Sequence, residues 1–186
     1  IATGARHHKF GIPIEQALEI YRRAKRSRHL RISGVGCHIG SQITSIDPFI
    51  TAVERLKKIF LHLRAEGISV RHLDVGGGLG IVYKDETPPH PREYARAILA
   101  VLGNLDCTLL LEPGRVIVGN AGALITRVVL TKRTSNKNFI VVDAGMSDLM
   151  RPSLYGAYHG IQVVALNRRS SWKADVVGPI CESGDF

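Results

Sequence analysis

The chain has 186 residues, 45% of them hydrophobic, which suffices for one large domain or two modest ones around a buried core. No apolar run approaches the ~20 residues of a membrane span and no secretory pattern opens the chain, so neither a membrane protein nor a secreted one is expected. The formal charge is +9, but the densest basic cluster falls in the second half of a predicted helix, without interleaved aromatic side chains, which argues against nucleic-acid binding. This cluster consists of Arg22, Arg23, Lys25, Arg26, Arg28 and Arg31.

Residues 13 to about 112 alternate between predicted helices and strands. Helices are expected over 13–29, 47–66 and 91–103, where apolar residues recur at helical spacing. The middle helix has the clearest ends. Asp47 is expected to cap it, Pro48 to take its first position and Gly67 to stop it.

Between these helices lie short runs rich in Val and Leu, which are typical of fully buried parallel strands. They are Ser33–Cys37, Val70–Val75 and Cys107–Leu111. Alternation of this kind indicates successive βα units. A complete (β/α)8 barrel needs about 250 residues, so part of a barrel is expected rather than a whole one. A doubly wound sheet is the alternative, but the rest of the chain leaves no room for further parallel strands.

After Arg115 the predicted helices fade and strand-like segments take over. These segments are Ala123–Thr131, Asn138–Asp143, Ile161–Leu166 and Asp175–Val177. They indicate an antiparallel β domain. The domains are therefore expected to cover residues 1–118 and 119–186.

Three polar or glycine-rich motifs each follow a predicted strand. They are HIGSQ at 38–42, GGGLG at 76–80 and EPGR at 112–115. The C-terminal ends of parallel strands gather at one edge of a sheet, so the three motifs are expected to form one site. Consecutive glycines let backbone N–H groups point at an anion, which favours a phosphate site over a flexible turn. The spacing does not match the dinucleotide-binding fingerprint.

Single residues in these motifs leave alternatives open. His38 is either a stacking partner for a flat ring, a ligand, or a histidine satisfied by nearby backbone, and Ser41 offers a hydroxyl to the same phosphate. Glu112 emerges from an apolar strand and should be paired, either with a protonated ring nitrogen or with Arg115. Arg115 itself can bind a carboxylate or a phosphate with two parallel hydrogen bonds.

The β part carries further candidates. Arg151 and Tyr155 are four residues apart and could bind a carboxylate, although such pairs are also common on surfaces. Cys181 lies beside Glu182 and near Asp185 in a loop flanked by Pro and Gly. Its thiol could donate a proton, whereas a nucleophilic role lacks an evident histidine base. Nothing in the pattern indicates a metal site, and three widely spaced cysteines favour a reducing cytoplasm.

Taken in order, HIGSQ, DVGGGLG, EPGR, DAGMSDLMRPSLY and GPICESGD closely resemble the diaminopimelate decarboxylase family, of the alanine-racemase-like class of pyridoxal-phosphate enzymes. The likeness covers nearly the whole chain, and RPSLY and CESGD favour this family over ornithine and arginine decarboxylases. It implies the C-terminal part of a (β/α)8 TIM-type barrel followed by an antiparallel β-barrel domain, both incomplete. It also implies decarboxylation of meso-diaminopimelate to L-lysine and a homodimer with shared active sites.

The resemblance implies a role for each candidate. His38 would stack on the pyridoxal ring and Glu112 would pair with its nitrogen. The phosphate would lie against one group of residues, and the substrate against another. The phosphate group comprises Ser41, Gly76, Gly77, Gly78, Pro113, Gly114 and Arg115. The substrate group comprises Arg115, Arg151, Tyr155 and Glu182, with Cys181 as the proton donor; Cys181 and Glu182 would serve the partner subunit's site.

The resemblance also implies residues outside these motifs. The family's Schiff-base lysine is expected upstream of Ile1, since Lys9 of the KFG motif is not at its position, and a phosphate-contacting tyrosine is expected beyond Phe186. We therefore expect a central fragment that is inactive alone and poorly soluble, because apolar edges would be exposed. Two alternatives remain: a related pyridoxal-phosphate decarboxylase acting on ornithine, arginine or carboxynorspermidine, and a non-catalytic module that binds anions or nucleic acid.

Overall fold

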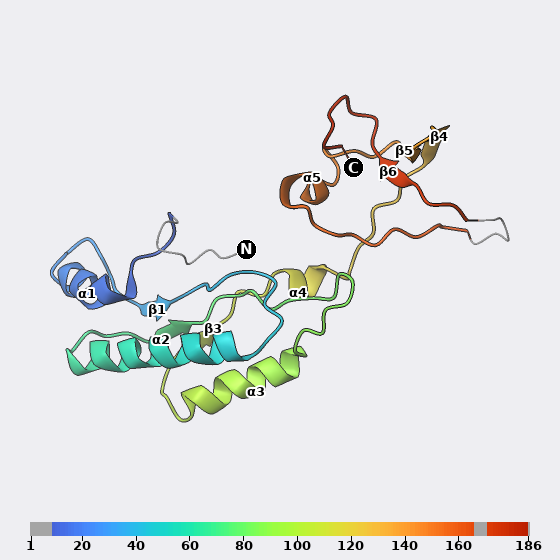
Figure 1. Cartoon of the computed structure of the whole chain (residues 1–186). Helices are drawn as coiled ribbons and strands as arrows, with labels where there is room; N and C mark the ends of the chain where they lie inside the picture. Colours follow the sequence, from blue (N-terminus) through green and yellow to red (C-terminus); the bar gives the residue numbers. More distant parts are fainter. Residues whose placement is uncertain (1–8, 166–170, 186) are drawn as a thin grey trace. The chain divides into compact units, whose positions relative to one another are not determined.

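The computed structural model describes residues 9–165 and 171–185 (Figure 1). The chain divides into two compact units, each treated by itself below. The first unit comprises residues up to Val82 together with Glu86–Gly122. The second comprises Tyr83–Asp85 together with the residues from Ala123 onward.

A parallel sheet of three strands lies at the centre of the first unit, in the order β1-β2-β3. The strands are β1 (Gly34–Gly36), β2 (His72–Asp74) and β3 (Thr108–Leu110). Each predicted strand is thus present but shorter than expected. The prediction that all three are fully buried is wrong for the two edge strands of this sheet, where Gly36 of β1 and Leu110 of β3 are exposed.

Two helices supply most of the core: α2 (Asp47–Ala65) packs on this sheet, and α3 (Pro91–Leu102) packs beside α2 (Figure 1). Their buried side chains recur every three or four residues, as expected for one apolar face toward the core. Phe49 of α2 and Tyr94 of α3 meet edge to face, with ring centroids 4.8 Å apart. Phe60, Leu63 and Leu73 have no exposed surface at all.

The helix ends confirm part of the prediction. Gly67 follows α2 with φ of +68°, the left-handed conformation that stops a helix. The prediction that Asp47 caps this helix is wrong, because Ile46 already has helical dihedral angles and Asp47 is the first helical residue. In α3 the cap is His90, whose ring accepts the Arg92 N–H while Glu93 accepts the His90 N–H.

The predicted helix over 13–29 is shorter than expected. It consists of a 3-10 turn, Ile14–Gln16, followed by α1, Ala17–Lys25. Within residues 9–165 and 171–185, no helix has both the length and the apolar composition needed to cross a bilayer.

The second unit is built on a mixed sheet in the order β4-β5-β6. The strands are β4 (Val128–Arg133), β5 (Asn138–Val142) and β6 (Asp175–Val177). β4 and β5 form the expected antiparallel hairpin, but β6 pairs with β5 in parallel, so the prediction of an antiparallel domain is wrong here. A tight turn joins β4 to β5, whereas a long connection leads to β6 and lets it return in the same direction.

Two short helices and one irregular segment also depart from expectation. Helices α4 (Arg115–Val118) and α5 (Arg151–Tyr155) lie where helices were expected to fade. The expected strand over 161–166 is irregular at 161–165, while Leu166 lies outside the described residues. Ile161 and Val164 are 71% and 91% exposed, so β-branched composition there is not accompanied by burial against a neighbouring strand.

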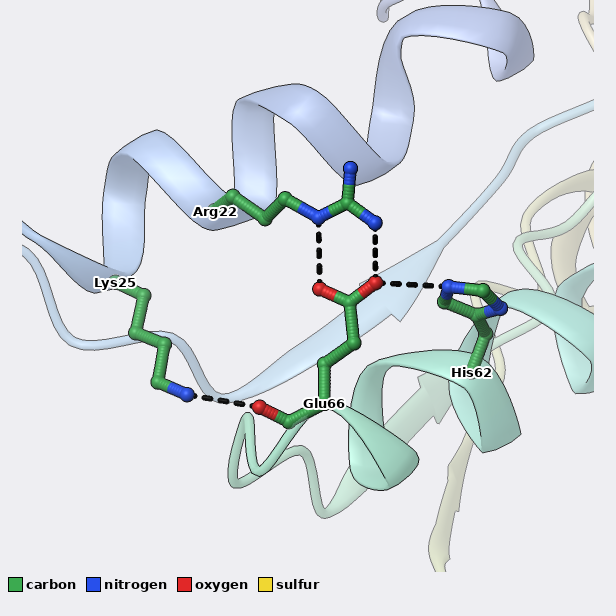
Figure 2. A network of polar contacts seen from close by, with 4 residues as sticks. All are labelled: Arg22, Lys25, His62 and Glu66. Carbon is green, nitrogen blue, oxygen red and sulfur yellow. Dashed lines mark hydrogen bonds and ion pairs between the residues drawn. The ribbon is translucent and has the colours of Figure 1, made fainter.

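A polar network joins α1 to the C-terminal end of α2 (Figure 2). The Glu66 carboxylate accepts two hydrogen bonds from Arg22, one of them 2.8 Å from Nε to Oε2, and lies 2.8 Å from His62 Nε2. Lys25 Nζ donates to the Glu66 backbone oxygen at 2.8 Å. Two residues of the basic cluster, Arg22 and Lys25, therefore face the C-terminal end of a neighbouring helix, where cations are favourable.

Replacing Leu63 by Ala should lower the free energy of unfolding by about 3 kcal/mol, because it leaves a cavity in a fully buried site. Denaturant unfolding of the complete gene product measures this. Leu61→Ala is the matched control on the same helix, since Leu61 is 47% exposed; equal losses in both variants would contradict the assigned core.

Replacing Glu66 by Gln should lower the melting temperature at neutral pH. The pKa of the Glu66 carboxyl is lowered from 4.5 to about 2, chiefly by its hydrogen bond with Arg22. A lowered carboxyl pKa stabilises the fold above pH 4.5, and this contribution disappears as the pH falls toward 2. The difference in melting temperature between wild type and Glu66→Gln should therefore shrink across that range. Glu54→Gln on α2 is the control, and a difference independent of pH would refute the network's role.

Candidate functional site

The three strand-end motifs of the first unit lie side by side, because the strands are in register. Gly36 pairs with Asp74, and Asp74 with Leu110, so β1, β2 and β3 end level with one another. The pairing continues beyond the strands, since Glu112 N–H donates to the Gly76 carbonyl at 2.9 Å. The sequence prediction that the three motifs meet at one edge of a sheet is confirmed.

Side chains connect the same three motifs. Gly77 N–H donates to His38 Nδ1 at 3.2 Å, and this nitrogen lies 3.8 Å from Glu112 Oε2. These two contacts place the His38 ring between the GGGLG and EPGR motifs. The His38 and Glu112 side chains are both exposed at the edge of the sheet, within reach of a ligand.

The glycines of GGGLG are required by close backbone contact. A Cβ on Gly77 would lie 2.0 Å from the Glu112 carbonyl oxygen, and one on Gly78 would lie 2.1 Å from that of Gly40. A Cβ on Gly76, whose φ is +69°, would lie 2.3 Å from the Cys37 carbonyl oxygen. Each glycine thus admits the backbone of a neighbouring motif where any other residue would collide.

Two of these backbone N–H groups already have acceptors. Gly76 N–H donates to Asp74 Oδ1 at 2.9 Å, and Gly77 N–H donates to His38. The expectation of three consecutive N–H groups aimed at an anion is therefore not met in this conformation. The phosphate role of Gly76, Gly77 and Gly78 stays a prediction, beside a packing role that the structure makes plain.

Gln42 has a role that the sequence analysis missed. Its side chain bonds Ile81 at both ends, with Nε2 donating to the carbonyl at 2.6 Å and Oε1 accepting the N–H at 3.2 Å. Oε1 also accepts from Arg115 Nη1 at 3.2 Å. Gln42 has a positive φ of 59°, unusual for a residue other than glycine. Its place at the end of HIGSQ was the only available signal.

The remaining residues of EPGR lie close to this edge. Pro113 and Gly114 are exposed and lead into α4, where Arg115 is the first residue and half-buried. Ser41 is half-buried between His38 and Gln42 in the HIGSQ loop. The first unit therefore brings together all the residues predicted to bind the cofactor.

The other candidates belong to the second unit. Arg151 and Tyr155 are the first and last residues of α5, and Tyr155 is 57% exposed. Arg151 Nη1 donates to Tyr83 Oη at 3.0 Å and lies 3.2 Å from His159 Nε2. The predicted pair is thus held on a short helix rather than a loop.

Cys181 and Glu182 are exposed on a loop shaped by Asp185. Asp185 is 4% exposed, and its carboxylate accepts the N–H of Met146 and, at 2.8 Å, that of Ile180. A Cβ on Gly178 would lie 2.3 Å from this carboxylate, so the glycine admits it. Hydrogen bonds from Ser183 Oγ and the Gly184 N–H lower the pKa of the Glu182 carboxyl, which keeps it anionic.

The three thiols differ in environment. Burial raises the pKa of Cys37 to about 11, with a further contribution from Asp74, so this thiol is a poor proton donor or nucleophile. Burial also raises the pKa of Cys107. Only Cys181 is exposed.

The pyridoxal binding domain of pyridoxal-dependent decarboxylases matches residues 1–119. The chain belongs to this family. Proteins of this family bind pyridoxal phosphate, so the cofactor expected from the sequence is confirmed. The residues at the sheet edge fit such a group chemically, since the Glu112 carboxylate suits a protonated ring nitrogen, the His38 ring a flat partner and the Arg115 cation a phosphate. Among the described residues, no cluster of His, Cys, Asp and Glu could hold a metal ion.

Individual relatives are similar over the whole chain. A diaminopimelate decarboxylase of Pseudomonas aeruginosa is 50% identical over 186 residues, which are 100% of this chain and 45% of that protein. The crystal structure of the Helicobacter pylori enzyme complexed with L-lysine superposes with a TM-score of 0.92 at 46% identity, covering 100% of this chain and 46% of that one. A diaminopimelate decarboxylase from M. jannaschii, also with L-lysine, gives 0.91 at 36% identity, over 98% of this chain and 44% of that one. The chain thus spans a little under half the length of these relatives.

Replacing Gly77 by Ala should weaken pyridoxal-phosphate binding by about tenfold or more, because the new Cβ pushes the GGGLG and EPGR motifs apart. Titration of the complete gene product with the cofactor, followed by absorbance, measures this. Gly122→Ala is the control, since a Cβ there meets nothing within 4 Å; unchanged affinity in Gly77→Ala would show that the contact does not matter.

Proposed function

We propose that the complete gene product decarboxylates meso-2,6-diaminopimelate to L-lysine and CO2 with pyridoxal 5′-phosphate. The observation that carries the proposal is the meeting of His38, Gly77 and Glu112 at one edge of a parallel sheet. Sequence identities of 50% and 51% to two diaminopimelate decarboxylases support the choice of substrate.

The cofactor site is assigned to the first unit. The His38 ring stacks on the pyridine ring, and Ser41, Gly76, Gly77, Gly78, Pro113, Gly114 and Arg115 surround the phosphate. When bound, pyridoxal phosphate accepts the electron pair left behind as CO2 departs. Glu112 holds the proton on the ring nitrogen, because an anionic oxygen favours the protonated form.

The substrate residues are assigned mainly to the second unit. Arg151, Tyr155 and Arg115 bind carboxylate, since a guanidinium can donate two parallel hydrogen bonds to it. Glu182, kept anionic by its neighbours, binds the distal ammonium group of the substrate. Cys181, whose thiol is exposed, donates a proton to the carbon that has lost CO2.

The proposal includes the architecture and the assembly. The parallel sheet with α2 and α3 is assigned to a (β/α)8 barrel, and the mixed sheet to a β-barrel domain. We assign the protein to a cytoplasmic homodimer in which Cys181 and Glu182 serve the partner's site. Three free thiols are compatible with a reducing compartment.

The test is CO2 release by the complete gene product from meso-diaminopimelate, ornithine, arginine and carboxynorspermidine. Only meso-diaminopimelate should be turned over efficiently. Glu112→Gln should lower kcat by about 100-fold, because the ring nitrogen loses its anionic partner. Glu54→Gln, a remote exposed change on α2, should leave kcat unchanged. Preference for another substrate, or cofactor-free and salt-sensitive anion binding without turnover, would refute the proposal.

A further inference from the structure

Arg151 contacts two aromatic side chains, those of Tyr83 and His159, and neither residue was predicted to be part of the site. Its Nη1 donates to Tyr83 Oη at 3.0 Å and lies 3.2 Å from His159 Nε2. Its Cζ lies 5.0 Å from the centre of the Tyr83 ring. Tyr83 and His159 meet edge to face, with centroids 5.8 Å apart at 84°. All three residues are half-buried within the second unit.

These contacts use Nη1 of the Arg151 guanidinium and leave its other edge for a ligand. Nη1 carries two N–H groups, which suffice for one hydrogen bond to Tyr83 Oη and one to His159 Nε2. Neither bond uses the edge formed by Nε and Nη2, which is well suited to binding a carboxylate through two parallel hydrogen bonds. Arginine side chains have considerable rotamer freedom, and anchoring Nη1 reduces the entropy lost when a ligand binds.

We propose that Tyr83 and His159 are positioning residues that orient Arg151 toward the carboxylate retained by the substrate when the other leaves as CO2. This inference rests on the proposed function. In meso-diaminopimelate the retained carboxylate becomes that of L-lysine. Cadaverine has the same diamine skeleton without a carboxylate. With Nη1 held in this way, Arg151 favours binding of L-lysine, which has the carboxylate, over cadaverine, which lacks it.

The arrangement requires a neutral His159, because only an unprotonated Nε2 accepts from Arg151. Burial, followed by repulsion from Arg151, lowers the pKa of His159 below its ordinary 6.5, which preserves the neutral form at physiological pH. The groups that face this ring are Arg151 from α5 and Tyr83 from the segment Tyr83–Asp85. The Lys84 ammonium lies instead over the neighbouring Tyr158 ring, 5.6 Å from its centre.

Protonation of His159 would remove the acceptor and place a second cation beside Arg151. The orientation is therefore present above the pKa of His159 and lost as the pH falls below it. The KM for meso-diaminopimelate should rise on the acid side in the wild type. In His159→Gln, whose side-chain oxygen accepts without titrating, this rise should be absent.

The experiment measures KM, kcat and calorimetric affinities for L-lysine and cadaverine in the complete gene product. Tyr83→Phe keeps the ring under Arg151 and removes only Oη, so KM should rise about threefold to tenfold with kcat nearly unchanged. His159→Leu should raise KM about tenfold, while His159→Gln should stay within about twofold of wild type. L-lysine binding should weaken by matching factors, and cadaverine binding should not change.

Tyr158→Phe is the matched control, since Tyr158 is 51% exposed and contacts Lys84 rather than Arg151. Circular dichroism checks that every variant is folded. Equal losses in His159→Leu and His159→Gln, or equal weakening of L-lysine and cadaverine, would overturn the inference. If the wild type binds L-lysine selectively through these residues but releases no CO2, the proposed function fails and the positioning role stands. If it does not bind L-lysine at all, both fail.

Discussion

The first unit depends on one steric constraint: three backbones must touch where three strands end. The approach of Gly77 to the Glu112 carbonyl, and of Gly78 to that of Gly40, leaves no volume for a side chain. With that contact made, Glu112 and His38 come within 3.8 Å of each other at the sheet edge. The geometry of the cofactor residues therefore follows from the absence of three side chains more than from any attraction between those present.

The two units solve the problem of holding exposed functional side chains by different means. In the first, backbone contact between strands that are in register is reinforced by Gln42, which joins two loops and Arg115. In the second, the carboxylate of Asp185 gathers N–H groups from two separate segments. Both devices hydrogen-bond backbone groups, and Gln42 in addition holds the side chain of Arg115.

Much of this could be predicted from the sequence, and the exceptions have physical causes. Helical periodicity and Gly67 located α2 closely, and the order of the motifs indicated that His38, Gly77 and Glu112 meet. Local patterns report poorly on what a segment packs against, however. The direction of β6 depends on a distant partner, and the exposed run at 161–165 has strand composition without burial. The acceptors of the Gly76 and Gly77 N–H groups likewise depend on side chains from other segments, and so does the role of Gln42.

The anchoring of the Cys181–Glu182 loop by Asp185 has a consequence for how such proteins diversify. The loop is shaped by a buried carboxylate, by main-chain amides, by the space that Gly178 leaves and by the hydrogen bonds of the Glu182 carboxylate. The Cys181 side chain is exposed beside this frame. The anchoring hydrogen bonds of Asp185 do not involve the exposed Cys181 side chain. A substitution of the exposed Cys181 thiol would therefore change the chemistry that the loop offers while the buried Asp185 still anchors its backbone.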